Sequence, residues 1–168
     1  MIQYEQNDYN QYIKNQRRLT AKKTNNGTTY FTWCTENIMR DVNVLLHEYR
    51  KDIQSILCHG CRCGTEEEIL KLLNPKVEVY GTDIYGDAYM FDKAYFREMD
   101  FDVVPDEWKE HFDVIYSNSI DHSRSPVNTL LAWKSELKSG GIMFVNFEWG
   151  RGVSKEDCSH LDGINYKA

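Results

Sequence analysis

The sequence predicts an α/β protein with a doubly wound, mostly parallel sheet that carries helices on both faces. From about residue 53 onward, short apolar runs alternate with segments of helical periodicity, as expected of repeated strand–helix units. The runs are continuously apolar, as in strands that are buried on both sides of a parallel sheet. The chain has 168 residues, the length of one ordinary domain.

A helical extension is expected to precede the α/β domain, so the chain divides into residues 1–50 and residues 51–168. Residues 4–19 carry a weak helical pattern that is rich in tyrosine. Residues 36–49 carry a firmer pattern, for which Thr35 is the expected N-cap. The apolar side of this second helix is predicted to consist of Ile38, Val42, Leu45, Leu46 and Tyr49.

The first strand–helix unit of the α/β domain is expected over residues 53–73. Residues 53–58 form an apolar strand, and a glycine-rich turn follows it at residues 60–64. A capping box from Thr65 to Glu68 starts a helix, which the Asn-Pro pair after Leu73 stops.

Four further strands and one longer helix are expected in the rest of the chain. The helix opens at Ser125-Pro126, with proline in the first helical position, and closes at Gly140-Gly141. The predicted strands cover residues 77–82, 95–99, 112–116 and 142–147, with a short helix or turn at residues 85–92 and one helical turn at residues 106–111.

Polar residues follow the first four predicted strands, and the carboxyl ends of parallel strands share one edge of a sheet. After the first strand, glycines at 60 and 64 let the backbone approach a ligand, and the next helix directs free N–H groups toward it. Asp83 follows Gly60 by 23 residues, the spacing at which a carboxylate grips a ribose diol. Asp100 ends the third strand, and Ser117 to His122 follow the fourth.

Five segments within residues 53–147 resemble the motifs of the class I S-adenosylmethionine-dependent methyltransferases. The most specific are Phe112 to Asn118, similar to the fourth-strand motif, and Leu137 to Ile142, similar to the Leu-x-x-Gly-Gly segment before strand five. The other three are Ile56 to Gly64, Val79 to Ile84 and Met99 to Phe101.

The resemblance implies a Rossmann-like fold with S-adenosylmethionine as the cofactor. It also implies transfer of a methyl group to an O or N nucleophile, on an acceptor that the sequence does not identify. The cofactor contacts are then expected from His59, Gly60, Cys61, Arg62, Gly64, Asp83, Ile84, Asp100, Phe101, Ser117, Asn118 and Ser119.

The chain departs from the family pattern at three places. Cys58 stands where the family usually carries an acidic residue, and Arg62 stands where it usually carries the middle glycine. Arg62 could hold the carboxylate of the ligand, which the glutamates at 66, 67 and 68 would repel. Only 21 residues follow Phe147, without a clear strand pair, so the C-terminal hairpin is expected to be short or missing, or another chain completes the sheet.

Asp121 and His122 are the expected catalytic pair, because they lie in the loop after the fourth strand. That loop opens toward the face where the methyl group should sit, and an imidazole can take a proton from a hydroxyl or amine at neutral pH. The alternative is that the pair only caps the loop before Pro126.

Composition limits the partners of the chain. A net charge of −6 disfavours sequence-blind binding to duplex nucleic acid, and no apolar run approaches the ~18 residues that cross a bilayer. The N-terminus lacks the pattern of a signal peptide and the cysteine count of five is odd, so reduced thiols and a cytoplasmic location are expected. No metal is expected at Cys58, Cys61 and Cys63, which lack a spaced second pair of ligands.

Two alternatives to a methyltransferase stay open. One is a methyltransferase-like binding or structural module without catalysis, and the other is an NAD-dependent oxidoreductase, which Asp83 would serve equally well. Asp100 and Ser117-Asn118 favour the methyl donor. Self-association into a homo-oligomer is also expected, because the strand at 142–147 is apolar on both faces and has no obvious hairpin to cover its edge.

Overall fold

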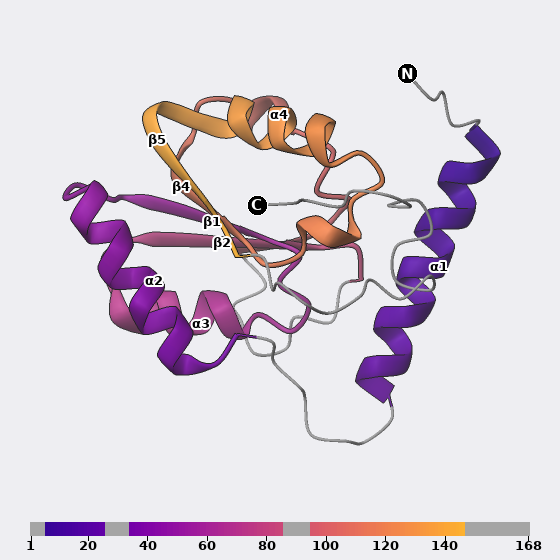
Figure 1. Cartoon of the computed structure of the whole chain (residues 1–168), viewed down its shortest axis with the longest axis horizontal. Coiled ribbons are helices and arrows are strands. Elements are labelled where there is room, and N and C mark those ends of the chain that lie inside the picture. Colours follow the sequence, from indigo (N-terminus) through magenta and orange to yellow (C-terminus); the bar gives the residue numbers. More distant parts are fainter. Residues whose placement is uncertain (1–5, 26–33, 86–94, 147–168) are drawn as a thin grey trace, which may run out of the picture.

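One sheet of five parallel strands organises residues 6–25, 34–85 and 95–146, which are the residues that the computed structural model describes. The strand order is β3-β2-β1-β4-β5, so the direction of winding reverses between β1 and β4 (Figure 1). This order confirms the predicted doubly wound α/β fold. The strands are β1 (Ser55–His59), β2 (Glu78–Asp83), β3 (Phe96–Glu98), β4 (Phe112–Ser117) and β5 (Leu137–Val145).

Helices cover both faces of this sheet. In Figure 1, α2 and α3 lie on one face and α4 lies on the other, while α1 stands beside the end of the sheet. Short 3₁₀ turns, η2 and η3, flank β4. The bounds are α1 (Gln6–Asn25), α2 (Glu36–Tyr49), α3 (Thr65–Leu73), α4 (Pro126–Glu136), η2 (Asp106–Trp108) and η3 (Ile120–His122).

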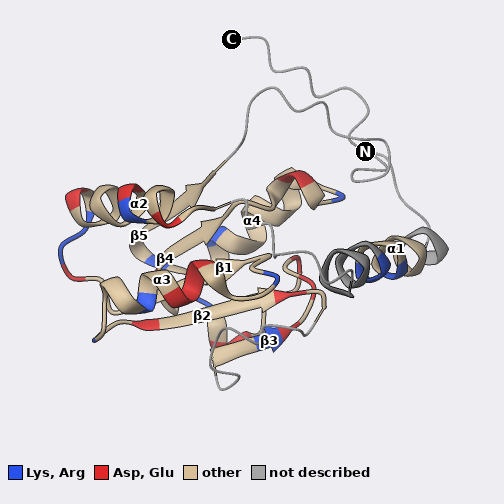
Figure 2. Cartoon of the chain, turned by 90° about the horizontal axis from the view of Figure 1, so that it is seen from below, with Lys and Arg blue, Asp and Glu red and all other residues tan. Residues whose placement is uncertain are grey.

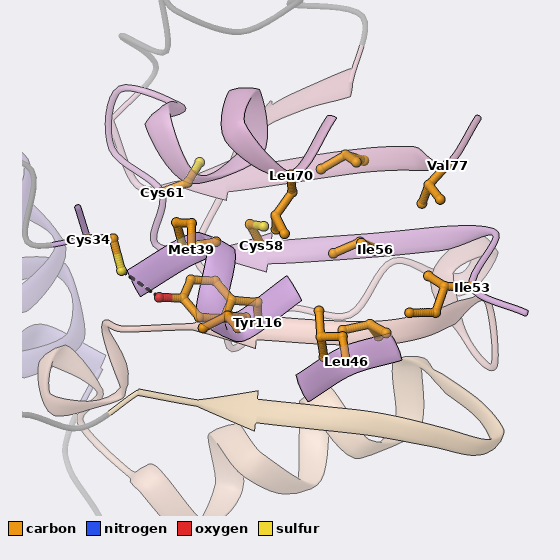
Figure 3. Close-up of a cluster of buried hydrophobic side chains, with 13 residues drawn as sticks. Cys34, Met39, Leu46, Ile53, Ile56, Cys58, Cys61, Leu70, Val77 and Tyr116 are labelled. Atoms are coloured by element: carbon orange, nitrogen blue, oxygen red, sulfur yellow. Dashed lines mark hydrogen bonds between the residues drawn. The ribbon is translucent and has the colours of Figure 1, made fainter. Parts of the chain in front are cut away.

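A first core lies between the sheet and helices α2 and α3 (Figure 3). Thr35 caps α2 as predicted, since its hydroxyl accepts the Ile38 N–H at 3.4 Å. The buried face of α2 is rotated from the predicted one, because Tyr49 is 78% exposed and Met39 is buried in its place. The buried members of this core are Cys34, Met39, Val42, Leu46, Ile53, Ile56, Cys58, Cys61, Leu70, Val77, Val79, Val114 and Tyr116.

A second core lies on the opposite face, under α4. Adjacent residues of β1 divide between the two cores: Ile56 and Cys58 enter the first core, and Leu57 enters the second. This division explains why β1 and β4 are continuously apolar in sequence. The buried members of the second core are Leu57, Trp108, Phe112, Ile115, Ile120 and Trp133.

Two predicted helix boundaries are wrong. The helix α4 ends at Glu136 rather than at the Gly-Gly pair, because Leu137 already pairs with Phe112 in the sheet. The pairing of β4 with β5 resumes only at Val114 and Ile142. The residues of β5 between Leu137 and Ile142, among them Gly140 at φ +72°, form an irregularity in this strand.

The capping box at the start of α3 does not form either. Gly64, in the left-handed region at φ +84°, occupies the N-cap position, and no side chain caps the helix there. Thr65 is therefore the first helical residue, and its hydroxyl lies 3.3 Å from the Cys63 thiol. Three parts of the predictions concern residues outside the described ranges. They are the expected turn at residues 85–92, of which only residue 85 is described, Cys158, and the segment after residue 146, where a C-terminal hairpin was in question.

Candidate functional site

The sheet register brings the ends of the strands to one level. His59 at the end of β1 pairs with Thr82 in β2 and with Ser117 in β4. Asp83 in turn pairs with Glu98 at the end of β3. The polar segments predicted to share one edge therefore do so, and the winding reverses between β1 and β4, where open α/β sheets bind ligands.

The glycine-rich turn is fixed by backbone hydrogen bonds. The N–H groups of Gly60 and Cys61 both donate to the Thr82 carbonyl, at 2.8 and 3.0 Å. Arg62 adopts a left-handed conformation with φ +48°, which favours glycine and costs an arginine about 1–2 kcal/mol. The turn thus keeps a glycine-type backbone although it carries an arginine.

Ser119 fills the space above Gly60. A Cβ on Gly60 would lie 2.5 Å from the Ser119 Cβ, and the Ser119 hydroxyl donates to the Gly60 carbonyl at 3.0 Å. The Ser117 hydroxyl donates to the His59 carbonyl at 3.0 Å, so the ends of β1 and β4 are joined twice. The glycine is therefore required by the protein itself as well as by any ligand.

Asp83 is the central carboxylate of this edge. It is buried, and its two oxygens accept the backbone N–H groups of Arg62 at 2.7 Å and Tyr85 at 3.0 Å. Burial raises the pKa of Asp83, and these N–H groups oppose the rise by stabilising its charge. Each carboxylate oxygen has a second lone pair, so Asp83 can still accept two ligand hydroxyls.

Asp100 and Phe101 lie after β3. Asp100 accepts the Tyr9 hydroxyl at 2.5 Å and the Asp102 N–H at 3.0 Å. The Phe101 carbonyl accepts the Trp133 indole N–H at 2.9 Å, and its ring packs edge-on against Trp133. Phe101 is thus anchored to the second core, and Asp100 is presented next to it.

The helix α1 lies along this edge and is bonded to three strand ends. Besides Tyr9, the Tyr12 hydroxyl donates to the His122 carbonyl at 2.5 Å. Arg17 donates to the Ile84 carbonyl at 3.2 Å and pairs with Glu98 at 3.1 Å. The guanidinium of Arg124 stacks on Tyr9, 4.5 Å from the ring centre. Nothing in the sequence pointed to these tyrosines except the aromatic richness of a weak helical pattern.

His59 and Cys61 turn their side chains away from the edge. His59 is buried, with one ring nitrogen 2.8 Å from the Thr82 hydroxyl and the other 2.9 Å from Glu136, and its ring stacks on Trp133. Cys61 belongs to the first core, and burial and the neighbouring Glu67 raise the pKa of its thiol well above the usual range. Neither side chain therefore points toward the carboxyl edge of the sheet.

Glu66, in the first turn of α3, is a site residue that sequence analysis missed. It accepts the Asn118 amide N–H at 3.1 Å, which links the start of α3 to the residue after β4 across the point where the winding reverses. Burial raises the pKa of Glu66 to about 7. Asn118 also contacts the Cys34 thiol at 3.6 Å, and that thiol lies 2.6 Å from the Tyr116 hydroxyl (Figure 3).

Asp121 and His122 form part of η3, directly after β4. His122 interacts electrostatically with Asp83 and acts to lower the pKa of that carboxyl, so the two residues share one electrostatic environment. The Nδ1 atom of His122 is buried and has no hydrogen-bond partner among the described residues. The structure therefore brings His122 to the edge occupied by the predicted cofactor residues.

Charge at this edge is unevenly distributed. Acidic residues gather at the start of α3, at the end of β2 and near the end of β3, as Figure 2 shows. In the described ranges no group of three or more His, Cys, Asp or Glu side chains could hold a metal ion. Over the same residues, no helix is long and apolar enough to cross a membrane.

Several solved structures with a similar fold are methyltransferases. No protein-family model matches the chain, and no curated protein matches it in sequence. A 1,6-didemethyltoxoflavin-N1-methyltransferase of Burkholderia thailandensis, solved with its substrate and S-adenosylhomocysteine, superposes with a TM-score of 0.63 at 13% identity, over 86% of this chain and 65% of that one.

Two further structures agree. An amino pentose methyltransferase of Micromonospora echinaspora with bound S-adenosylmethionine gives a TM-score of 0.60 at 16% identity, over 90% of this chain and 60% of that one. A sugar N-methyltransferase of a Streptoalloteichus species gives 0.57 at 18% identity, over 68% and 49%. The chain thus spans about half to two thirds of their length, and it has the Rossmann-like fold of class I S-adenosylmethionine-dependent methyltransferases.

Proposed function

We propose that the carboxyl edge of the sheet binds S-adenosylmethionine and that the protein transfers its methyl group to an O or N nucleophile. The observation that carries the proposal is the sign of charge around the edge. Asp83 ends β2, Asp100 follows β3, and three more carboxylates occupy the first turn of α3. A dinucleotide places its pyrophosphate at such a helix N-terminus, where ionised Glu66, which contacts Asn118 at this edge, would repel it.

The donor set fits S-adenosylmethionine. Asp83 would accept the ribose hydroxyls, and Asp100 with Phe101 would hold the adenine. Ile84 would line the adenine side, and the methionine end would meet the turn at residues 60–64 and Ser117 to Ser119. When bound, the cofactor supplies a methyl group on an already activated sulfonium, so the chain has to align the acceptor and remove a proton where needed.

Proton removal is proposed to fall to His122 or Asp121. His122 lies at the same edge as Asp83, and its Nδ1 has no hydrogen-bond partner among the described residues. A positioned imidazole or carboxylate can accept the proton that an acceptor hydroxyl or amine loses. The helix α1, bonded to the edge through Tyr9 and Tyr12, would cover the cofactor and select the acceptor.

Transfer of a tritiated methyl group from S-adenosylmethionine tests this proposal. Wild-type protein is incubated with a panel of sugars, amines, phenols and peptides, and Asp83→Ala serves as the variant with a damaged cofactor site. We expect one acceptor class to gain label with the wild-type protein and to lose most of it with the variant. Binding of the cofactor without labelling of any acceptor would instead support a binding module.

The binding module remains the second candidate because of one contact. Asp100, the carboxylate expected to hold the adenine, already binds Tyr9 of α1. If α1 holds the edge closed, the fold would act through partners rather than through catalysis. The NAD-dependent oxidoreductase is disfavoured by the acidic start of α3.

Self-association and a cytoplasmic location also remain proposals. Strand β5 is the last strand of the sheet at the β4 side within the described residues, and its side chains from Ile142 to Val145 are only partly buried. An apolar edge of this kind is commonly paired or covered, so we expect a homo-oligomer or a covering segment. Light scattering at tens of micromolar protein distinguishes a monomer from a dimer.

A further inference from the structure

Of the three carboxylates in the first turn of α3, Glu66 is the one that contacts a residue at the carboxyl edge of the sheet. Glu66 is almost completely buried. Its carboxylate accepts a hydrogen bond from Asn118, which follows β4 at the point where the winding of the sheet reverses between β1 and β4. The neighbouring thiols cannot supply the charge, because burial raises the pKa of Cys58 and of Cys61 well above the usual range. Glu66 is therefore the anion of the α3 side of this edge.

Glu67 provides an independent observation. Its side chain is fully buried, and neither carboxylate oxygen has a hydrogen-bond partner among the described residues. It packs so closely under the turn that a Cβ on Gly81 would lie 2.1 Å from its Oε1 and 2.9 Å from the Cys61 sulfur. Burial and the charge of Glu66 raise the pKa of Glu67 well above its usual range. Of the two carboxylates, Glu66 is the one whose charge a hydrogen bond stabilises, because the Asn118 amide donates to it.

A buried carboxylate at the edge selects the group that lies next to it. Ionised Glu66 repels a carboxylate or phosphate and attracts an ammonium. S-adenosylmethionine carries an amino group at its methionine end, the end assigned to this turn. We propose that Glu66 anchors that amino group through a charge-assisted hydrogen bond, with Asn118 orienting the carboxylate. This inference rests on the proposed function.

Calorimetric titration with two ligands tests the role of Glu66. S-adenosylhomocysteine carries the amino group, and its desamino analogue lacks only that group. We expect Glu66→Gln to weaken S-adenosylhomocysteine by about tenfold or more, the loss for a charge-assisted hydrogen bond, and to change binding of the desamino analogue by less than about threefold. Glu68→Gln, which removes a half-exposed charge from the same helical turn, is the matched control and should leave both affinities unchanged.

The outcomes separate this inference from the proposed function. Equal weakening of both ligands by Glu66→Gln, or no weakening of either, would overturn the anchoring role while leaving the cofactor site in place. Failure of S-adenosylhomocysteine to bind wild-type protein would overturn the proposed function itself. Thermal melting of each variant, compared with wild type, shows whether a loss of affinity reflects unfolding.

Proton release gives a second readout. With a pKa of about 7, Glu66 is about half protonated at pH 7 in the free protein, and a bound ammonium expels that proton. Binding enthalpies in phosphate and Tris buffers at pH 7 should therefore reveal release of about half a proton, which Glu66→Gln abolishes. Equal release by both proteins would contradict the inference.

Several charged or titratable groups interact electrostatically with Glu66 and belong to its environment in any measurement of pH dependence. They are Arg62, Asp83, Glu67, Cys34, Cys58 and Tyr116.

Discussion

Replacing Gly60 by alanine should destabilise the protein through its contact with Ser119. The new Cβ would lie 2.5 Å from the Ser119 Cβ and 2.6 Å from its Oγ, a distance that requires the chain to shift. The φ of +73° adds the cost of a left-handed alanine. We expect about 1–2 kcal/mol from the backbone and about 1–3 kcal/mol from the overpacking, so about 2–5 kcal/mol in all.

A double-mutant cycle in urea unfolding separates these two costs. In the Ser119→Gly background the overpacking disappears, so Gly60→Ala should cost only the backbone part, about 1–2 kcal/mol. The two substitutions are then non-additive by about 1–3 kcal/mol. Additivity within about 0.5 kcal/mol would refute the reasoning and show that Ser119 does not occupy the space above the first glycine.

Three further predictions concern the carboxylates and the imidazole. Asp83→Ala should weaken S-adenosylhomocysteine by about 30- to 150-fold in calorimetry, since two ribose hydroxyls lose their acceptor, and an unchanged affinity would remove Asp83 from the site. Asp113→Asn should cost about 2–3 kcal/mol in urea unfolding at pH 7, because the buried Asp113 binds Arg50 at 2.7 Å and Lys138, one third exposed, at 3.1 Å. Burial acts to raise the pKa of Asp113, but backbone N–H groups and Lys138 outweigh it and hold the pKa below its usual range. The stability that Asp113 contributes is therefore present above about pH 4 and is lost as the pH falls further. If the unfolding free energy of Asp113→Asn fell with acid as steeply as that of wild type, this reasoning would be contradicted. His122→Ala should lower methyl transfer by about 10²-fold or more at unchanged cofactor affinity, and full turnover would move the proton transfer elsewhere.

Much of the sheet could be predicted because its strands are buried on both faces. Runs such as Ile56 to Cys58 have no polar face, and that pattern fits few structures other than a covered parallel strand. The same topology makes the strand ends meet, so Asp83 and Asn118 could be assigned to one edge from the sequence. Thr35 was likewise predictable, because an N-cap is a local interaction over three residues.

The errors arose where tertiary contacts overrode local preference. A Gly-Gly pair commonly ends a helix, but pairing of Leu137 with Phe112 ends α4 earlier and leaves the glycines in β5. Tyr9 and Asp100 are 91 residues apart, and no local pattern links them. Glu66 was not among the expected site residues, and only the structure shows that this glutamate is buried and contacts Asn118.

Side-by-side calorimetry of wild-type protein with S-adenosylhomocysteine and with NAD tests the central claim most directly. The acidic start of α3, Asp83 at the end of β2 and Asp100 after β3 predict micromolar binding of S-adenosylhomocysteine and no measurable binding of NAD. Binding of NAD without binding of S-adenosylhomocysteine would contradict the account, because the start of α3 would then accept a pyrophosphate that Glu66 is expected to repel.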